Sequence, residues 1–151
     1  MKCTWRWLRF EELGADGVYD MLALRARVFV VEQACAYLDV DGADRRAWHL
    51  LGRDPAGVLM AYLRVLDPGV KFDDPSIGRV AVDASVRGQG IGHDLLRQAM
   101  ARCAALWPQY GVALSAQAHL QRLYRTHGFE TVSDEYLDDG IAHVDMRRSA
   151  P

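Results

Sequence analysis

The feature that most constrains the fold of this chain is a glycine-rich turn between a predicted strand and a predicted helix. Residues 80–92 read Val-Ala-Val-Asp-Ala-Ser-Val-Arg-Gly-Gln-Gly-Ile-Gly. The β-branched residues indicate the end of a strand, and an amphipathic helical pattern follows the turn. The first N–H groups of a helix have no partner within it and carry the positive end of the helix dipole, so glycines there let an anion approach the backbone. The turn therefore predicts a binding site for a pyrophosphate.

The spacing of the glycines shows which of the known phosphate-binding motifs this turn does not match. A Walker loop ends in Gly-Lys-Ser/Thr, whereas Gly92 is followed by His93 and Asp94. A dinucleotide fingerprint needs Gly-x-Gly-x-x-Gly at the first strand, whereas Gly88, Gly90 and Gly92 are two residues apart and lie past mid-chain. A turn without a ligand is the structural alternative. It is disfavoured because glycine in the first turn of a helix costs up to about 1 kcal/mol relative to alanine.

The remaining patterns predict an α+β order of elements. Runs of β-branched and aromatic residues predict strands at 5–10, 47–53, 58–66, 77–82, 112–115, 129–136 and 141–146, with a hairpin turn at 54–57. Helical spacing predicts a helix capped by Asp16 and ending near Glu32, a helix that follows the glycine turn and stops at Pro108, and a third helix closed by Gly128. Cys103 lies on the apolar stripe of the second helix and is predicted to be in the core.

Length, charge and cysteine usage limit the classes of protein. A chain of 151 residues that is half apolar suits one domain, 1–151, with a sizeable core. A net charge of −2 with scattered basic residues argues against a nucleic-acid partner. No segment resembles a signal peptide or a membrane span, so we expect a cytoplasmic protein without a membrane partner. Cys3, Cys35 and Cys103 include no Cys-x-x-Cys pair, which argues against disulfides and a zinc site.

The acidic segment at 34–46 is predicted to be irregular, and it invites a metal-site interpretation. Asp39-x-Asp41-Gly42 matches part of a calcium loop, but the full pattern needs an acid at Tyr37 and a glutamate at Trp48, so no metal is predicted. Two interpretations remain open: a solvated acidic loop, or a negative rim that attracts a cationic amine and consists of Glu32, Asp39, Asp41 and Asp44.

The sequence resembles a known family at the glycine turn and along most of the chain. Arg87-x-x-Gly90-x-Gly92 matches the Arg/Gln-x-x-Gly-x-Gly/Ala signature of the GNAT acyltransferases. Further segments resemble the ElaA-like branch: LRARVFVVEQ (24–33), YLDVDGAD (37–44), SAQAHL (115–120), YRTHGF (124–129) and DGIAH (139–143). The resemblance implies an α+β GNAT fold, whose mixed, mostly antiparallel twisted sheet has six to seven strands, flanking helices and a splayed parallel pair that binds coenzyme A.

The resemblance also implies the reaction and the residues that bind the coenzyme. Acetyl-coenzyme A is the expected co-substrate, and a small-molecule or peptide amine is the expected acceptor. Backbone groups of Val80, Ala81 and Val82 are implied to pair with the pantetheine and to polarise the thioester carbonyl. Val80 and Val82 can at the same time be ordinary core strand residues, because only their backbones are needed. The pyrophosphate is implied to bind the turn made by Arg87, Gly88, Gln89, Gly90, Ile91 and Gly92. Many GNAT proteins carry an asparagine just ahead of the next helix, where this chain has Gln117.

Direct attack by an amine requires a base for the amine, with a pKa of about 10.4, and an acid for a thiolate, with a pKa of about 8.5. The resemblance implies that Tyr124 lies near the coenzyme sulfur and can donate to the thiolate; a buried core tyrosine is the alternative. Glu32 could take the amine proton directly or through water, or form a salt bridge at the helix end. His119 could share a helix face with Tyr124, or be a structural histidine. His49 and His143 fit inner strand positions and are weaker candidates.

These observations predict an acyl-coenzyme-A-dependent N-acyltransferase that works through a ternary complex. No cysteine has a sequence-evident activating partner, so a covalent acyl-enzyme is not predicted. The alternative is a domain that binds or senses coenzyme A without catalysis. Exposed strand edges near the C-terminus suggest a homodimer.

Overall fold

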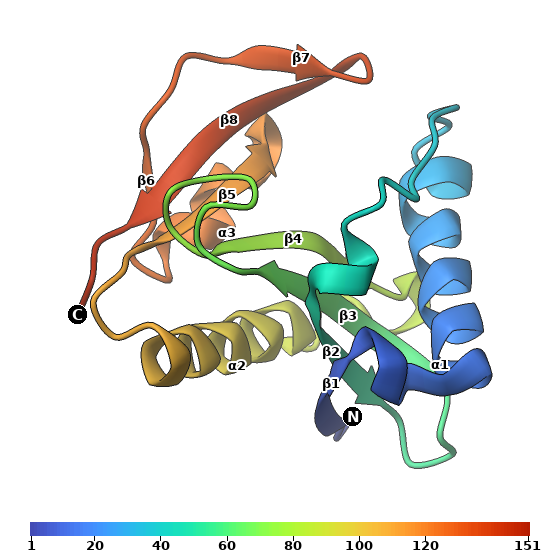
Figure 1. Ribbon diagram of the computed structural model, residues 1–151. Coiled ribbons are helices and arrows are strands. Elements are labelled where there is room, and N and C mark those ends of the chain that lie inside the picture. Colours follow the sequence, from blue (N-terminus) through green and yellow to red (C-terminus); the bar gives the residue numbers. More distant parts are fainter.

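An eight-stranded mixed sheet passes through the whole molecule (Figure 1). The computed structural model describes residues 1–151. The strands are β1 (Thr4–Arg9), β2 (Trp48–Arg53), β3 (Leu59–Leu66), β4 (Ser76–Val82), β5 (Val112–Gln117), β6 (Glu130–Thr131), β7 (Tyr136–Asp138) and β8 (Ile141–Arg148). Their spatial order is β1-β2-β3-β4-β5-β8-β6, with β7 also paired to β8. Only β4 and β5 pair in parallel, so the sheet is mixed and mostly antiparallel, as predicted.

The sheet has eight strands, whereas six to seven were expected. The segment expected as one strand at 129–136 forms β6 and β7, which pair with different parts of β8. Ser133 separates them, because its side-chain oxygen accepts the hydrogen bond of the Asp145 N–H at 2.8 Å. Residues 133–135, Ser-Asp-Glu, also have low strand propensity.

The parallel pair of strands separates after a short contact. β4 and β5 pair only where Ser76 faces Ala113 and Ile77 faces Leu114. Beyond these positions β4 is irregular: its register against β3 shifts, and Arg79 adopts a φ of +53°. The chain therefore contains the splayed parallel pair that the family resemblance implies.

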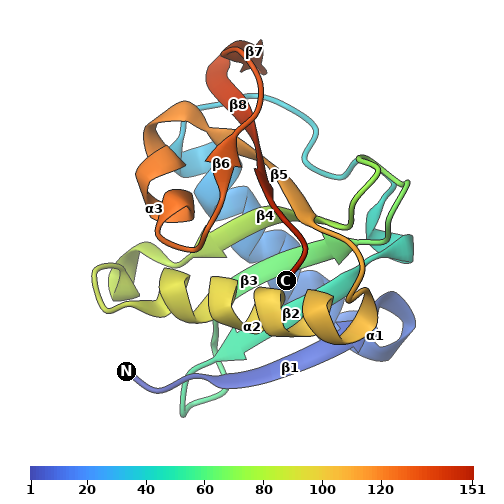
Figure 2. The same cartoon turned by 90° about the vertical axis from the view of Figure 1, so that its left-hand side faces the viewer.

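Helices cover both faces of the sheet (Figure 2). On one face lies α1 (Phe10–Arg25), which continues as a π-helix, η1 (Ala26–Glu32). On the other lie α2 (Ile91–Leu106) and, after the 3₁₀ turn η4 (Ala118–Leu120), the short α3 (Gln121–Arg125). Each face has its own hydrophobic cluster, and the α2 cluster includes the buried Cys103, as predicted. None of these helices has the length and apolar character needed to span a lipid bilayer.

The first helix begins earlier than predicted. We expected Asp16 to cap it, but α1 starts at Phe10. Gly14, with φ +69° and ψ 175°, interrupts the helical backbone, and the regular apolar spacing begins only after that break. The other end is as predicted, because η1 ends at Glu32 and Gln33 is its C-terminal cap.

A largely buried charge network holds the segment between η1 and β2, and it corrects the interpretation of the acidic residues there as a negative rim. Three arginines from α1, β3 and β4 pair with three aspartates of this segment: Arg25, Arg64 and Arg79 with Asp39, Asp41 and Asp44. Arg25 is fully buried and lies 2.7 Å from both Asp39 Oδ2 and Asp44 Oδ1. The Arg64 guanidinium holds the pKa of Asp41 well below its usual range. Asp39 and Asp44 are buried, and all three carboxylates, including the partly exposed Asp41, are paired with arginines, so these aspartates do not form the negative rim that was one of the two predicted alternatives.

Candidate active site

A cavity of about 880 Å³ lies where β4 and β5 separate. At one end it is lined by the glycine turn and the first residues of α2. Its lining also includes Gln33 and Cys35 after η1 and Asp139 and His143 of the β7–β8 hairpin. The Cys35 Sγ lies 3.5 Å from the Asp139 carbonyl oxygen, so these two parts of the lining touch. The cavity thus joins the predicted anion site to a second, polar compartment.

The glycine turn is open toward the cavity. Gly88 and Gly90 have φ values of +79° and +82°, and Gly90 is the N-terminal cap of α2. A Cβ atom placed on Gly88, Gly90 or Gly92 would meet no heavy atom within 4 Å. Protein packing therefore does not require glycine at these three positions. The positive φ explains Gly88 and Gly90, and the open space around all three leaves the backbone of the turn accessible to an anion.

Most of the residues predicted to bind the coenzyme line this cavity: Val80, Val82, Arg87, Gly88, Gly90, Ile91, Gly92 and Gln117. Ala81 and Gln89 do not line it. The Ala81 side chain is buried on the α1 face, as strand alternation requires. Gln89 accepts a hydrogen bond from the N-terminal ammonium of Met1 at 3.1 Å.

Arg87 and Glu32, predicted for different roles, bind each other. Arg87 Nη1 lies 2.6 Å from Glu32 Oε2, and Nη2 lies 3.0 Å from Oε1. Arg87 Nε also donates to the Val82 carbonyl at 3.0 Å. A salt bridge at the helix end was one of the two roles that the sequence predicted for Glu32, and the structure contains it. Both side chains are about 40% exposed, so an anion at the turn could compete with Glu32 for the guanidinium.

Tyr124 presents a buried ring and an unpaired hydroxyl to the cavity. The side chain packs edge-on against Phe129, with ring centroids 6.2 Å apart. Only 6% of the residue is exposed, and burial raises the pKa of Tyr124 to about 12. Its hydroxyl makes no hydrogen bond within the protein. The group is therefore a phenol that stays protonated at neutral pH and can donate to a ligand in the cavity.

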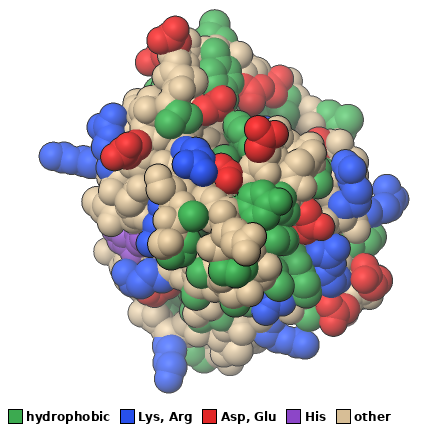
Figure 3. Space-filling view, turned by 60° about the vertical axis from the view of Figure 1, so that its left-hand side comes forward, with side chains coloured by type: hydrophobic (Ala, Val, Ile, Leu, Met, Phe, Trp, Pro, Cys, Tyr) green, Lys and Arg blue, Asp and Glu red, His purple; other side chains and the backbone are tan.

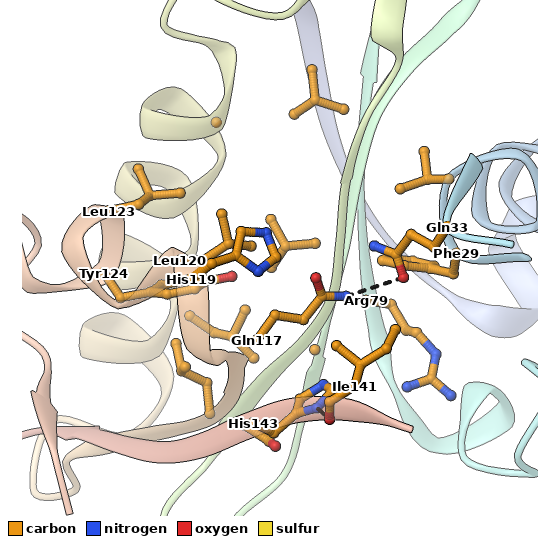
Figure 4. Close-up of a pocket in the computed structure, with 18 of the residues that line it drawn as sticks. Phe29, Gln33, Arg79, Gln117, His119, Leu120, Leu123, Tyr124, Ile141 and His143 are labelled. Carbon is orange, nitrogen blue, oxygen red and sulfur yellow. Dashed lines mark hydrogen bonds between the residues drawn. The ribbon is translucent and has the colours of Figure 1, made fainter. Parts of the chain in front are cut away.

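His119, Gln117 and Tyr124 all line the cavity, but they come from different elements (Figure 4). His119 belongs to η4 rather than to α3, so it does not share a helix face with Tyr124, contrary to the interpretation from the sequence. Gln117, the last residue of β5, donates from Nε2 to Gln33 Oε1 at 3.1 Å and so connects two walls of the cavity. His49, a weaker candidate, lies outside the cavity and is fully buried.

Sequence reasoning missed a polar array on the neighbouring strands. Ser115 of β5 is hydrogen-bonded to the Tyr136 hydroxyl, which donates to Asp145 Oδ1 at 2.6 Å. His143, treated as a weak candidate, lies on the same face of β8 as Asp145 and lines the cavity. The alternating pattern Ile141-x-His143-x-Asp145 is a signal that could have identified this face.

Comparisons with known proteins agree with this arrangement. Residues 48–150 match the family model described as an acetyltransferase (GNAT) domain. A crystal structure of an acyl-CoA N-acyltransferase from Pseudomonas aeruginosa is 43% identical, with a TM-score of 0.92, covering 98% of this chain and 100% of that one. The crystal structure of Escherichia coli ElaA is 39% identical, with a TM-score of 0.91, covering 97% and 99%.

A UPF0039 protein of Synechocystis sp. is 41% identical over 146 residues, which are 97% of this chain and 95% of that protein. The glycine turn at the start of α2, the splayed strands and these similarities lead to one conclusion. The chain belongs to the GNAT acetyltransferase family, in the branch that contains ElaA.

Proposed function

We propose that this protein transfers an acetyl group from acetyl-coenzyme A to an amine by direct attack within a ternary complex. One observation carries the proposal: a single cavity connects an open anion-binding turn, two separated strands and the hydroxyl of Tyr124. The similarity to a protein described as an acyl-CoA N-acyltransferase supports an amine as acceptor.

The anion-binding turn and β4 supply the proposed coenzyme site. The N–H groups at the start of α2, together with Arg87, bind the pyrophosphate. Unpaired backbone groups of residues 80–82 bind the pantetheine in place of a neighbouring strand. A backbone N–H aimed at the thioester oxygen stabilises the negative charge that develops there, and such a donor contributes about 2.7–4 kcal/mol in a dry site.

Two proton transfers complete the proposed reaction. The neutral amine nitrogen forms a bond to the acyl carbon, and the bond between that carbon and the coenzyme sulfur breaks. Tyr124 donates its phenolic proton to the departing thiolate. The amine proton passes to a side chain on the acceptor side; from the sequence, Glu32 and His119 are the proposed bases. For Glu32 this role requires that the pyrophosphate first displace it from Arg87, which holds both of its carboxylate oxygens.

The acceptor and the compartment are part of the same proposal. A small-molecule or peptide amine enters through the part of the cavity lined by Cys35 and Asp139, which lie together. All three cysteines are free thiols, which is the state that a reducing compartment such as the cytoplasm maintains.

Thiol release from acetyl-coenzyme A, measured against a panel of amines and peptides, tests the proposal. We expect Tyr124→Phe to lower kcat by about 10²–10⁴-fold at an unchanged KM for the coenzyme. Arg87→Ala should chiefly weaken coenzyme binding. Tyr110→Phe and Arg97→Ala change exposed residues outside the cavity and serve as matched controls.

Three results would contradict the proposal or part of it. Coenzyme binding without transfer to any acceptor would favour a sensing domain. Absence of coenzyme binding would remove the central claim. Full activity of Tyr124→Phe would exclude this residue as the acid.

A further inference from the structure

The hydrogen bonding of His143 fixes which of its ring nitrogens carries a proton. Nδ1 lies 2.7 Å from the carbonyl oxygen of Ile141. Because a carbonyl oxygen only accepts hydrogen bonds, Nδ1 must be the donor. The neutral ring therefore has its lone pair on Nε2, and no protein group is hydrogen-bonded to that atom.

The ring of His143 is also held in place by its neighbours. Tyr136 stacks on it, with centroids 6.1 Å apart and planes inclined by 26°. Tyr136 is itself anchored through its hydroxyl to Asp145 at 2.6 Å and to Ser115. The imidazole is thus fixed by a hydrogen bond and a stacking contact without any ligand, which is the preorganisation that a catalytic group needs.

His143 lines the cavity beside Ile141, in the part proposed for the acceptor (Figure 4). It faces Gln117 across β5 and β8, and Gln117 is in turn bonded to Gln33 of the opposite wall. Of the two bases proposed from the sequence, Glu32 and His119, neither is both free and held in a fixed orientation as His143 is. Both carboxylate oxygens of Glu32 are held by Arg87, and the exposed His119 has no hydrogen bond that fixes its ring.

We propose that His143 Nε2 is the base that takes the proton from the acceptor amine; this inference rests on the proposed function. As the amine nitrogen bonds to the acyl carbon and the carbon–sulfur bond breaks, the nitrogen-bound proton moves to Nε2, directly or through one water. The thiolate takes the phenolic proton of Tyr124. His143 then releases its proton to solvent, and Tyr124 regains one, so both residues return to their starting states.

Other titratable or charged groups share this compartment or the strands around it. They are Tyr136 and Asp138 on β7, Asp139 in the hairpin turn, Asp145 on β8, Arg79 on β4, Lys71 before β4, Cys35, Tyr37 and Asp41 after η1, and His119 on η4. None of them is hydrogen-bonded to His143. The ionisation of any of these groups can contribute to the pH profile of the unmodified protein. The test therefore compares the profiles of His143 variants with that of the unmodified protein.

The two amide replacements of His143 separate its two nitrogens. In His143→Asn the side-chain NH₂ can replace Nδ1–H and keep the bond to Ile141, but nothing replaces Nε2. In His143→Gln a polar group lies near the position of Nε2, but it cannot accept a proton at neutral pH. Acetyl-coenzyme A affinity and thermal unfolding, measured for both variants, show whether the fold and the coenzyme site are intact.

We expect both variants to bind acetyl-coenzyme A normally and to lose about 10²–10⁴-fold in kcat/KM for the acceptor at neutral pH. The part of the acidic limb that is due to His143 should disappear, which leaves only the rise caused by deprotonation of the amine, and the defect should shrink as pH rises, because hydroxide can then take the amine proton. A loss that is equal at all pH values would indicate a structural role and overturn the inference. It would also be overturned if the acidic limb were unchanged in both variants and its enzyme-dependent part were lost instead in His119→Asn or Glu32→Gln.

A second measurement needs no acceptor. In ¹⁵N spectra of the unmodified protein, we expect the neutral His143 ring to carry its proton on Nδ1; a proton on Nε2 would overturn the inference. The failure of the proposed function is seen separately, as an absence of transfer by the unmodified protein with every amine tested. If no amine is acetylated, the proposed function is wrong and the proposed role of His143 is wrong as well.

Discussion

His49 and His143 show how the partners of a histidine decide what it can do. His49 is fully buried, and both of its nitrogens are used: Nε2 donates to the Asp44 carbonyl at 2.8 Å, and Nδ1 accepts from the Tyr62 hydroxyl at 2.6 Å. His143 uses only Nδ1, and the residue lines the cavity. The first is a structural residue, whereas the second has a free lone pair. The sequence treats both as inner strand positions and does not distinguish them.

Stability should fall at mildly acidic pH because of His49. Burial lowers the pKa of this imidazole, so below about pH 6.5 the unfolded chain binds a proton that the native state resists. The free energy of unfolding should therefore decrease from pH 7 toward pH 5, by at most about 1.4 kcal/mol per pH unit for this residue. Burial also lowers the pKa of His127, which acts in the same direction.

Urea unfolding at several pH values, with His49→Gln for comparison, measures this effect. The variant should be less stable at pH 7 but should show a shallower pH dependence. Asp41 and Asp44, whose pKa values are lowered by their arginine partners against the effect of burial, lose stabilisation only below about pH 4 and do not obscure this range. A steeper slope in the variant would contradict the interpretation.

Among the elements, the start of α2 gives the sharpest comparison. Gly90 has a φ of +82°, which costs a residue with a Cβ roughly 1–2 kcal/mol. Gly92 has no such φ, and its Cβ would meet no other atom. We expect Gly90→Ala to weaken coenzyme binding roughly tenfold, because the strain reshapes the turn. The family signature allows alanine at the position of Gly92. We therefore expect Gly92→Ala to bind the coenzyme with nearly the affinity of the unmodified chain.

Isothermal titration with acetyl-coenzyme A and thermal unfolding, run on both glycine variants, check this prediction. Gly92→Ala should be at least as stable as the unmodified chain, because alanine is favoured over glycine in a helix by up to about 1 kcal/mol. Unchanged affinity of Gly90→Ala would show that the geometry of the turn does not determine binding.

The buried charges around Arg25 connect α1 and β3 to the segment before β2. Removing one partner of a buried ion pair leaves the other charges uncompensated, which typically costs about 3–5 kcal/mol. We expect Arg25→Met to lower the free energy of unfolding by an amount in this range. Arg53→Met is the matched control, because Arg53 pairs with Asp20 at the surface and such pairs contribute about 0–1 kcal/mol. Equal effects in urea unfolding would contradict the assignment.

Regular elements could be predicted from the sequence, whereas long-range pairings could not. Six of the strands lie within two residues of the predicted ranges, because alternation and turn residues are local signals. The partners of Asp39, Asp41 and Asp44 lie on three other elements, and no spacing indicates them. The same holds for the Arg87–Glu32 pair. Anion binding at the glycine turn could be proposed from local spacing, but the hydrogen bond that fixes His143 depends on the hairpin conformation.

At the scale of the whole molecule, the outer surface and the sheet edges determine association. On the face in Figure 3, acidic and basic side chains are interspersed with apolar ones and form no continuous basic area. At the β7 edge, Leu137 is 76% exposed and Val132 after β6 is 61% exposed. β7 pairs only with β8, so its other side has free backbone groups.

We predict that the chain self-associates through this edge. Sedimentation velocity at micromolar concentration should give a mass of about twice the 16.9 kDa of one chain. Leu137→Lys should shift the distribution toward the monomer, because charge on an edge strand opposes pairing. Val58→Lys, at an exposed position in the β2–β3 turn, is the control. A monomer at every concentration would contradict the prediction.

The short contact between β4 and β5 divides the sheet into two half-sheets, β1–β4 and β5–β8, joined at only two residue pairs. The amide groups that point into the gap have no strand partner, so their hydrogens should exchange rapidly with deuterated solvent, whereas those shared with β3 exchange slowly. A pantetheine in the gap would slow this exchange on both sides at once. The coenzyme would then serve as an interior strand of the sheet, and chains that bind it would resist unfolding as one cooperative unit.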